Sequence, residues 1–395
     1  MKKILFVDTG REYGGGTKSF LYLLRGLAAQ QKYELCAFFE TDYEAGGRKI
    51  SQIIEEAGAK FINFEPKKQP SKLKKELLRA LGGQILAKYL YKKDYDYALC
   101  LLRQVRPDIL HLNNHFSTNL SYIAAANALN IAVVQHLRKN SAVEPFKLEI
   151  LKRLKFTPVC VSNATYYFYA AQIKMPKNVV YNPVEAPILR REKSEASENL
   201  SLSQTNLKDS GDDKSAALKA KFDAEKINIV MPANFLTLKG HELVFDALAG
   251  LKRSDVKVYF AGGGELKAGA KAKFDALIKS GKVEYLGFVS KMDEIYAACD
   301  YVLGFSSDEG LPRVVIEALG CGLGVVYSDI AVIREIYEIS SKKQDFFIVQ
   351  RSSDALLACF EGLRKPASKS PDDAVIKAFS IENYLRGIDR IYSEL

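Results

Sequence analysis

Two glutamates stand eight positions apart in the stretch "SSDEGLPRVVIEALGCG", which runs from Ser306 to Gly322. The apolar run 301–307 before them reads as a strand, so Glu309 falls in a strand-to-helix turn and Glu317 on the helix. Pro312 suits the first helical turn because its missing N–H would be unpaired there. The remaining N–H groups of that turn and the helix dipole predict an anion site, most naturally for phosphate.

Glu317, about two turns inside that helix, cannot favour phosphate, but its carboxylate can accept hydrogen bonds from a pair of sugar hydroxyls. The spacing therefore predicts three sub-sites in sequence: a reacting sugar near Glu309, phosphate at the helix start, and ribose near Glu317. The competing interpretation is that Asp308 or Ser307 caps the helix and Glu317 is solvated. The two acids alone leave both interpretations open.

Composition narrows the class of protein. The chain has 395 residues, of which 48% are apolar, enough for two domains with sizeable cores. Its six cysteines are scattered, with no C-x-x-C pair, which favours a reduced cytoplasmic protein over a disulfide or zinc scaffold. The N-terminal "MKKILFVDTG" predicts a first strand rather than a signal peptide. No run approaches the roughly 20 apolar residues of a membrane-spanning helix.

The positive charge is confined to one half of the chain. Residues 1–185 carry 28 Lys and Arg against 16 Asp and Glu, whereas the remainder carries 29 against 31. The first half therefore has a net charge of +12, and such asymmetry indicates an anionic partner for it. Membrane headgroups, nucleic acid and a phosphorylated substrate all fit, but no recognised nucleic-acid motif accompanies the charge, so we expect no nucleic acid.

Short apolar runs alternate with helical patterns on both sides of a polar stretch, which predicts βαβ units and parallel sheets. We predict an α/β fold of two Rossmann-like domains facing each other across a cleft at the carboxyl ends of their strands. The predicted limits are 1–189 for the first domain, 190–226 for a polar linker, 227–378 for the second domain, and 379–395 for a terminal helix that returns to the first domain.

The elements that must position the two acids are read from the same alternation. The predicted strands are 2–8, 33–40, 108–114, 131–137, 157–162, 227–235, 256–264, 283–288, 301–307 and 322–328. The predicted helices are 17–30, 50–59, 240–251, 265–280, 292–300 and 312–320.

Taken in order, segments along nearly the whole chain resemble the motifs of retaining family-four glycosyltransferases of the two-Rossmann (GT-B) type. "EGLPRVVIEALGCG" resembles the family's E-x7-E motif, and "EYGGGTKSF" resembles its first glycine-rich loop. Four further segments resemble its motifs: "PDILHLNNH", "VVYNPVE", "ANFLTLKGHELVFDAL" and "VKVYFAGGGEL". Each is weak alone, but their order and spacing together are specific.

The resemblance implies roles for matching residues. It places Glu317 on the nucleotide ribose, Lys239 on the diphosphate, and Glu309 on the donor sugar. A fixed lysine makes physical sense, because cleavage of a sugar–phosphate bond builds negative charge on the departing diphosphate. The resemblance also implies that the donor is contacted by Gly310, Leu311, Pro312, Asn234, Gly263 and Gly264.

Two departures from the family pattern stand out. The family usually has an arginine where this chain has Asn234, so another base, such as Arg313, Arg138 or Lys18, would replace it or the phosphate would be held more weakly. The family usually has a proline where this chain has Gly324. The segment after Glu335, "YEISSKKQDFFIVQ", also lacks the family's glycine pair.

In the first half, His111 ends a predicted strand and is expected to face the cleft, where the family often has a histidine near the donor sugar. A structural hydrogen-bonding role is the alternative, and it applies more strongly to His115 and His136. Gly14, Gly15 and Gly16 would let the first loop approach donor phosphate or acceptor closely.

Metal chemistry is not expected. Asp94 and Asp96 form a D-x-D pattern, but they lie in a lysine-rich region away from a strand end, so we interpret the pattern as chance. No Cys and His cluster has zinc spacing. We therefore predict no cofactor and no metal, with a nucleotide-diphosphate sugar as co-substrate.

Residues 66–93 hold nine Lys and Arg and one acid, interleaved with apolar residues at helical spacing. This pattern favours peripheral contact with the anionic inner-membrane surface, and an ordinary helix packing its apolar stripe on the core is the alternative.

Together these observations predict a metal-independent, retaining glycosyltransferase on the cytoplasmic face of the inner membrane. Its acceptor would be a lipid-linked oligosaccharide or a lipopolysaccharide core, bound by the first domain, and the second domain would bind the donor. The alternatives are a nucleotide-sugar epimerase or phosphorylase on the same fold, and an idle partner that binds glycan or nucleotide.

Overall fold

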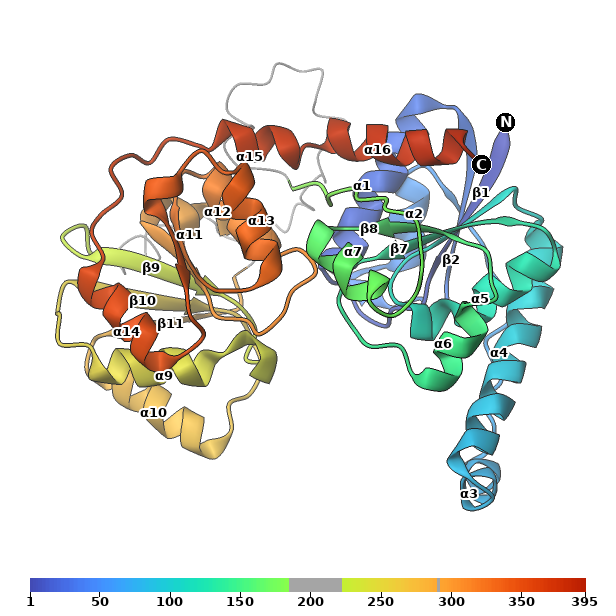
Figure 1. The fold of residues 1–395 in the computed structure, drawn as a ribbon, viewed down its shortest axis with the longest axis horizontal. Helices are drawn as coiled ribbons and strands as arrows, with labels where there is room; N and C mark the ends of the chain where they lie inside the picture. Colours follow the sequence, from blue (N-terminus) through green and yellow to red (C-terminus); the bar gives the residue numbers. More distant parts are fainter. Residues whose placement is uncertain (185–221, 290–291) are drawn as a thin grey trace. The chain divides into compact units, whose positions relative to one another are not determined.

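The computed structural model describes residues 1–184, 222–289 and 292–395, which fold into two compact units (Figure 1). Unit 1 comprises Met1–Pro183 together with Ile381–Leu395, and unit 2 comprises Val184–Ser380. Most of the predicted linker, residues 190–221, lies outside the described residues. Each unit is built on a six-stranded parallel sheet, so the predicted α/β class holds in both halves.

The sheet of unit 1 has the strand order β5-β2-β1-β6-β7-β8. Its strands read as continuous apolar runs because both faces of the sheet are covered. Their bounds are β1 Lys2–Asp8, β2 Tyr33–Phe39, β5 Lys60–Phe61, β6 Ile109–Leu112, β7 Ala132–Leu137 and β8 Thr157–Cys160. A separate antiparallel pair is formed by β3 Glu44–Ala45 and β4 Arg48–Lys49.

Two cores sandwich this sheet, and alternate strand residues point into each. Ile4 and Phe6 belong to the core under α1, α2 and α16, whereas Leu5 and Val7 belong to the core under α4, α5, α6 and α7. The helices are α1 Gly15–Gln30, α2 Ile50–Glu56, α3 Lys72–Ala80, α4 Gly83–Val105, α5 Phe116–Ala128, α6 Pro145–Leu151, α7 Asn163–Ala170 and α16 Ile381–Ser393.

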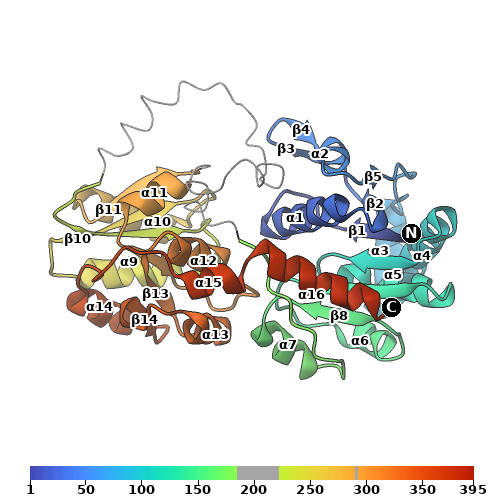
Figure 2. The ribbon, with the colours of Figure 1, turned by 90° about the horizontal axis from the view of Figure 1, so that it is seen from above.

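The last helix, α16, lies along unit 1 (Figures 1 and 2). It buries Tyr384, Ile388, Ile391 and Tyr392, which share one helical face. On α1, a Cβ at Gly26 would come within 2.4 Å of Leu385 Cδ1, so only glycine lets the two helices approach this closely.

Unit 2 repeats the plan with the strand order β11-β10-β9-β12-β13-β14. Its strands are β9 Ile227–Pro232, β10 Val256–Ala261, β11 Val283–Gly287, β12 Tyr301–Gly304, β13 Gly324–Ser328 and β14 Phe346–Val349. Its helices are α9 His241–Gly250, α10 Ala268–Lys279, α11 Met292–Ala298, α12 Arg313–Gly320, α13 Ala331–Ile339, α14 Ser353–Gly362 and α15 Asp373–Ala378, with short 3-10 turns η3 Thr237–Lys239 and η4 Lys343–Asp345. The sequence did not predict β14, which forms one edge of the sheet.

Without the small β3–β4 pair, each sheet runs third-second-first-fourth-fifth-sixth in chain order, the doubly wound Rossmann order. The chain reverses its direction of travel between β1 and β6 in unit 1, and between β9 and β12 in unit 2. Ligands of such sheets bind outside the carboxyl ends of the strands at this switch point. The fold therefore points to two loop clusters, one in each unit.

Candidate functional site

The switch point of unit 2 brings together the loop after β9 and the loop after β12. The backbone N–H of Ser307 donates to the carbonyl of Leu238 at 2.8 Å, which ties the two loops to each other. Lys239 lies in the first of these loops and Glu309 in the second, so two of the motifs that carried predicted donor residues meet here.

Lys239 and Glu309 form an ion pair, with 2.5 Å between Nζ and Oε1. The glycine after the lysine makes this contact possible. Gly240 has φ 73°, and a Cβ there would lie 2.2 Å from the carbonyl oxygen of Phe305. Only glycine therefore lets the first loop press against the end of β12, and this close approach delivers Lys239 to Glu309.

The carboxylate of Glu309 has a second support. Ser306 Oγ donates to Glu309 Oε1 at 2.8 Å, and the Tyr327 hydroxyl lies 3.3 Å from Ser306 Oγ. Burial, followed by the charge of Glu309, raises the pKa of Tyr327, so this phenol stays a neutral donor. The side chains of Lys239 and Glu309 remain 26% and 16% exposed. The pair is thus held in place yet reachable by a ligand.

Helix α12 begins at Arg313, and Pro312 is its N-cap residue. Gly310, Leu311 and Pro312 are buried and form the turn between Glu309 and the helix. Pro312 has no side chain that can cap the first-turn N–H groups, and Ser307, one of the two predicted caps, directs its Oγ to the carbonyl of Leu238 instead. The positive end of the α12 dipole therefore begins a few residues from Glu309.

Glu317 is half-buried and held on both sides. The Tyr296 hydroxyl donates to Oε2 at 3.2 Å, and Arg313 Nη2 lies 3.6 Å from Oε1, one turn back on the same helix. Burial, followed by the charge of Glu317, raises the pKa of Tyr296 well above its ordinary value. The interpretation of Glu317 as a solvated surface acid is therefore wrong. Its carboxylate is fixed in orientation, as recognition of two hydroxyls requires.

Asn234, Gly263 and Gly264 come together in a neighbouring pair of loops. Asn234 Oδ1 accepts from the Gly263 N–H at 2.9 Å, and the Phe235 N–H donates to the Gly263 carbonyl at 2.8 Å. Gly264 has φ 101°, which favours glycine. Asn234 thus ties the loops after β9 and β10 instead of supplying charge, and its side-chain NH2 makes no hydrogen bond with the part of the chain that the structure describes.

The structure offers a base that the sequence did not identify in place of the missing arginine. Arg351 follows β14, and its Nε donates to the Phe305 carbonyl at 3.2 Å. Its Nη2 lies 3.3 Å from the position of a Cβ on Gly240, so the guanidinium stands beside the lysine loop. Of the three bases considered from sequence, Arg313 lies beside Glu317, whereas Arg138 and Lys18 belong to unit 1. A sequence analysis that recognised the strand β14 would have placed Arg351 just after the carboxyl end of that strand, on the same side of the sheet as Lys239 and Glu309.

The second departure from the family pattern, Gly324, has a packing reason. It opens β13, where its N–H donates to the Asp300 carbonyl at 2.9 Å. A Cβ there would lie 2.3 Å from Tyr301 Cε1. The ring of Tyr301 therefore occupies the space that a larger residue would need, and the site around Glu309 is not involved.

The switch point of unit 1 is built from neutral groups around one buried acid. Asp8 ends β1 and accepts from the Gly10 N–H, Asn113 Nδ2 and Asn114 Nδ2, each at 2.6 Å. These bonds hold the glycine-rich loop to the end of β6. The pattern follows the same topology as unit 2, but no Lys or Arg in the described part of the chain forms an ion pair with Asp8.

Arg138 follows β7, and amides, a histidine and a phenol surround it. Its Nε donates to Asn113 Oδ1 at 2.5 Å, Nη1 donates to Asn182 Oδ1, and Nη2 donates to the Tyr384 hydroxyl at 3.2 Å. Within the described ranges it has no carboxylate partner. A Cβ on Gly16 would lie 3.4 Å from Arg138 Cδ, so the loop of Gly14, Gly15 and Gly16 at the start of α1 passes over this guanidinium.

The predicted position of His111 at a strand end facing a cleft is wrong. His111 lies inside β6, is 0% exposed, and packs on Phe6. Its Nδ1 lies 2.6 Å from the Tyr392 hydroxyl of α16, and its Nε2 lies 3.3 Å from His136 Nδ1. His111 is the third residue of β6, so the strand does not end at it, and α16 covers this face of the sheet.

The two histidines share one hydrogen-bonded chain. Arg138 Nη2 can only donate, and it lies 3.4 Å from His136 Nδ1, so His136 Nδ1 accepts. His111 Nε2–H then donates to the same atom, and His111 Nδ1 accepts from Tyr392. Burial and, after it, the charge of Arg138 lower the pKa of His111 to about 3, which keeps both rings neutral. His115 instead caps α5 through the Ser117 N–H.

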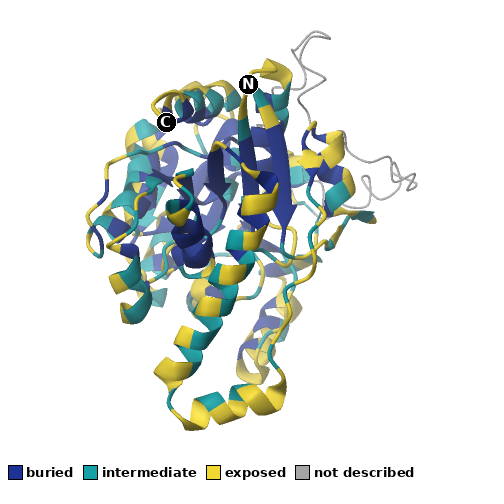
Figure 3. Cartoon of the chain, turned by 90° about the vertical axis from the view of Figure 1, so that its right-hand side faces the viewer, coloured by how far each residue is buried: buried dark blue, intermediate teal, exposed yellow. Residues whose placement is uncertain are grey.

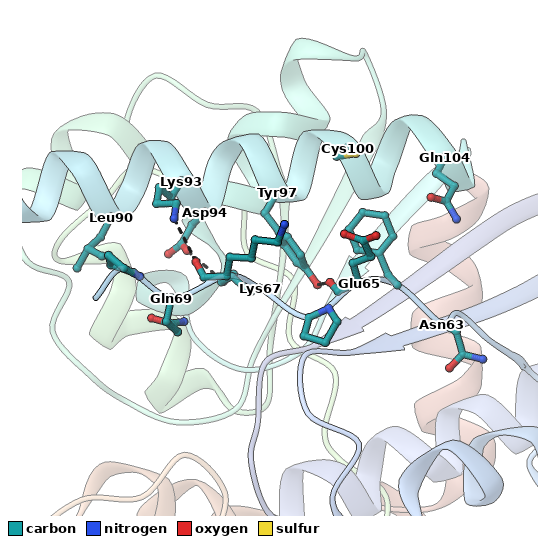
Figure 4. Close-up of a pocket in the computed structure, with 14 residues that line it drawn as sticks. Asn63, Glu65, Lys67, Gln69, Leu90, Lys93, Asp94, Tyr97, Cys100 and Gln104 are labelled. Atoms are coloured by element: carbon teal, nitrogen blue, oxygen red, sulfur yellow. Dashed lines mark hydrogen bonds and ion pairs between the residues drawn. The ribbon is translucent and has the colours of Figure 1, made fainter. Parts of the chain in front are cut away.

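A cavity of about 600 Å³ lies elsewhere in unit 1, between the segment 63–70 and α4 (Figure 4). Lys67 crosses it and pairs with Glu40 at 2.9 Å and Asp94 at 3.1 Å. The cavity contains none of the predicted site residues. The D-x-D pattern lies on α4. Asp94 forms its ion pair with Lys67, and Asp96 forms one with Lys92 at 2.7 Å.

The described parts of the chain contain neither a metal-binding cluster nor a membrane-spanning helix. No group of three or more His, Cys, Asp or Glu among those residues is arranged to hold a metal ion, and metal independence stays a prediction. None of the helices in those parts is long and apolar enough to cross a bilayer.

Comparison with known proteins finds a family match in the second half of the chain and structural similarity along the whole chain. Residues 213–363 match the family described as glycosyl transferases group 1. No curated protein matches the sequence. The glycosyltransferase from Rickettsia africae ESF-5 aligns with 100% of this chain and 98% of its own at 16% identity and a TM-score of 0.72.

Two other solved structures match along their whole length, covering 100% of both chains. Anabaena HepE, solved in complex with UDP and glucose, has 17% identity and a TM-score of 0.68. The lipopolysaccharide outer core galactosyltransferase WaaB, in its apo form, has 15% identity and a TM-score of 0.68. These matches confirm the predicted fold of two Rossmann-like domains. The family match over residues 213–363 agrees with the resemblance found in the sequence, and it covers Lys239, Glu309 and Glu317.

Proposed function

We propose that this chain, whose residues 213–363 form a glycosyl transferases group 1 domain, moves a sugar from a nucleotide-diphosphate sugar to a hydroxyl of a glycan acceptor. The anomeric configuration would be retained, and no metal ion would take part. The observation that carries the proposal is the Lys239–Glu309 pair at the switch point of unit 2.

The pair suits a diphosphate with a sugar on its end. Lys239 can turn from Glu309 to the phosphate oxygens, since it is held by one charged partner and remains partly exposed. The positive end of α12 adds to the same field. Glu309, released from the lysine, would accept hydrogen bonds from hydroxyls of the donor sugar. In this proposal the resting ion pair keeps both groups in place until the donor arrives.

The nucleoside would lie further along α12. Glu317 is oriented by Tyr296 and Arg313, and it would accept from the two ribose hydroxyls. The Asn234 amide, with its NH2 directed at no described residue, would donate to a phosphate oxygen, and Arg351 would supply the positive charge that the missing arginine gives in the family. UDP-sugars are the donors to test first, because HepE was solved in complex with UDP-glucose.

The proposed reaction runs on one face of the sugar. The bond between the anomeric carbon and the β-phosphate oxygen breaks, and its electron pair goes to that oxygen. The acceptor oxygen bonds to the anomeric carbon from the same side, and its proton passes to the departing phosphate. Lys239 and the start of α12 stabilise the charge that builds on the diphosphate, which is the role of a fixed cation in such a transition state.

The acceptor in this proposal is an envelope glycan on a lipid carrier or a lipopolysaccharide core, which unit 1 would bind. Arg138, with only neutral partners in the described part of unit 1, would attract an anionic group of such an acceptor beneath the Gly14–Gly16 loop. The protein would then work as a peripheral protein on the cytoplasmic face of the inner membrane. The net charge of the first half supports this placement.

The test is an incubation of the purified protein with a panel of UDP-, GDP- and ADP-sugars, with and without lipid-linked oligosaccharide and lipopolysaccharide-core acceptors. Mass spectrometry identifies the product, and NMR of the anomeric proton gives the configuration. Acceptor-dependent transfer with retention, undiminished by a chelator, supports the proposal. A modified donor formed without acceptor would instead indicate an epimerase or phosphorylase.

An idle binding partner is distinguished by variants. Glu309→Ala and Lys239→Ala should each lower transfer in vitro by about 10²-fold or more, and cells that carry both should not build a normal envelope glycan. If cells carrying both substitutions build a normal envelope glycan, the chain acts by binding alone and the proposal is wrong.

A further inference from the structure

Helices α3 and α4 form an arm that projects from unit 1. The buried residues of α4 are Ala98, Leu101, Leu102 and Val105, all in its second half, whereas its first half contacts the body through the partly buried Tyr91. Figure 3 shows the first half of α4 extending away from the sheet, with α3 lying across its far end. The turn between them uses Gly82 with φ 131°, which favours glycine.

The far end of the arm exposes an apolar stripe. No residue of α3 is buried. Leu73, Leu77 and Leu81 recur every four residues and are 79%, 62% and 63% exposed, and Ile85 at the start of α4 is 46% exposed. Large apolar side chains grouped in this way on a water-facing helix are unusual in a soluble protein, and they mark an interaction surface.

The same end carries strong positive charge. Residues 66–93 hold nine basic side chains and one acidic side chain. On α3, Lys72, Lys74, Lys75 and Arg79 form no ion pair with any described residue. Lys74 Nζ instead lies 4.7 Å from the ring centre of Tyr89, which fastens α3 to α4. The sequence could not distinguish this arm from an ordinary core helix, because helical spacing does not show what an apolar stripe contacts.

The base of the arm is braced. Lys67 pairs with Glu40 and with Asp94 of α4, and the Tyr97 hydroxyl donates to the Glu65 carbonyl at 2.9 Å (Figure 4). These bonds join the segment that leads into α3 to the part of α4 nearest the body. These contacts therefore hold the base of the arm against unit 1, and α3 lies at the end of the arm away from the sheet.

We propose that α3 docks on an anionic lipid bilayer. Leu73, Leu77 and Leu81 enter the boundary between headgroups and acyl chains, while the surrounding lysines bind anionic headgroups. Charge decides between this occupant and a second copy of the chain. A net charge of +8 on residues 66–93 repels the same segment of another molecule and attracts an anionic surface.

This docking surface extends the proposed function. It rests on that function in one respect, which is that a lipid-borne acceptor requires the protein to work at a membrane. Its test needs neither donor nor acceptor. Failure of sugar transfer and failure of docking are therefore separate results.

The experiment is co-sedimentation of the full chain with vesicles. One set contains phosphatidylcholine with a third of phosphatidylglycerol, and the other contains phosphatidylcholine alone. We expect binding to the anionic set, weakened by raising the salt from 0.1 to 0.5 M. Leu77→Ser with Leu81→Ser should lower the partition coefficient about tenfold. Lys72→Glu and Lys75→Glu should each lower it about fivefold or more.

A matched control comes from unit 2, where Ile278 and Lys279 are exposed on α10. Ile278→Ser with Lys279→Glu should leave vesicle binding unchanged. Circular dichroism and thermal unfolding check that each variant folds, which we expect because the substituted side chains are exposed. Equal loss of binding in the control, or equal binding to both vesicle sets, would overturn the proposal. So would self-association that the leucine variants abolish without any vesicle binding, which would assign α3 to a second copy.

Discussion

The switch points of the two units share one topology and hold opposite kinds of chemistry. In unit 2 a cation and an anion, Lys239 and Glu309, face each other and remain partly exposed. In unit 1 the buried Asp8 accepts three N–H hydrogen bonds, and Arg138 donates to amides and a phenol. Ion pairs at a reachable edge can exchange partners with a charged ligand, whereas the amide network of unit 1 fixes loops. We infer that, in the proposed reaction, unit 2 binds and stabilises the charged diphosphate.

The largest effect should come from Lys239. Lys239→Ala removes the cation beside the departing diphosphate, so kcat should fall about 10²- to 10³-fold, as when a preorganised charge-stabilising donor is lost. Steady-state transfer kinetics measure it. Lys273→Ala on α10, which breaks the exposed pair with Asp246 of α9, is the matched control and should leave kcat unchanged. A similar loss in both variants would mean that Lys239 has no special role.

The next largest effect concerns stability. It distinguishes a residue that packs the core of unit 2 from the residues of the candidate site. Gly324→Pro removes the N–H that donates to Asp300 and places ring atoms against Tyr301, so it should cost about 3 kcal/mol of unfolding free energy. Urea unfolding followed by circular dichroism measures the change. Gly269→Ala on α10, where a Cβ meets nothing within 4 Å, should be neutral or slightly stabilising. A proline variant as stable as the wild type would contradict the packing explanation.

Acid should weaken unit 1 more than unit 2. The pKa of His111 is lowered to about 3 in the folded chain, against about 6.5 when unfolded. Between these values the unfolded chain binds a proton that the folded chain does not, so stability is full above pH 6.5 and falls as pH falls. At pH 5 the loss from His111 is about 2 kcal/mol. The pKa of His136 is lowered as well, whereas unit 2 contains one histidine, His241, with a pKa of about 4.

Hydrogen exchange followed by mass spectrometry checks this difference, because it reports peptides of each unit separately. Lowering the pH from 7 to 5 should reduce protection of β6 and β7 more than that of β9 and β12, after correction for intrinsic exchange rates. Equal change in both sheets, or greater loss in unit 2, would show that the buried histidine chain does not control the acid response.

The smallest effect belongs to Glu317. Glu317→Gln keeps the shape but weakens the acceptor for two hydroxyls, so the Kd for the nucleoside diphosphate should rise about tenfold. Isothermal titration calorimetry measures it. Glu338→Gln on α13, an exposed acid with a long 3.8 Å contact to Lys343, is the control and should not change the Kd. An unchanged Kd in Glu317→Gln would remove the ribose assignment.

Sequence reasoning described the surroundings of its chosen residues better in unit 2 than in unit 1. Glu309, Glu317 and Lys239 follow clear strand and helix patterns, and local spacing placed them together with few steps. His111 failed because its burial depends on α16, which is 270 residues away in the chain and packs Tyr392 onto β6. Arg351 was missed because β14, with only four residues, carries little periodic signal. Leu73 and Leu77 are exposed because no other part of unit 1 covers α3. A local sequence pattern does not show which elements a helix will contact.

The role of the Lys239–Glu309 pair is tested most directly by calorimetry with matched ligands. The diphosphates UDP, GDP and ADP and their nucleosides are titrated into the wild type and into Lys239→Ala. If the pair receives the diphosphate, the preferred diphosphate binds the wild type at least about tenfold more tightly than its nucleoside, and Lys239→Ala removes most of that difference. A difference that persists undiminished in Lys239→Ala would show that the diphosphate binds elsewhere.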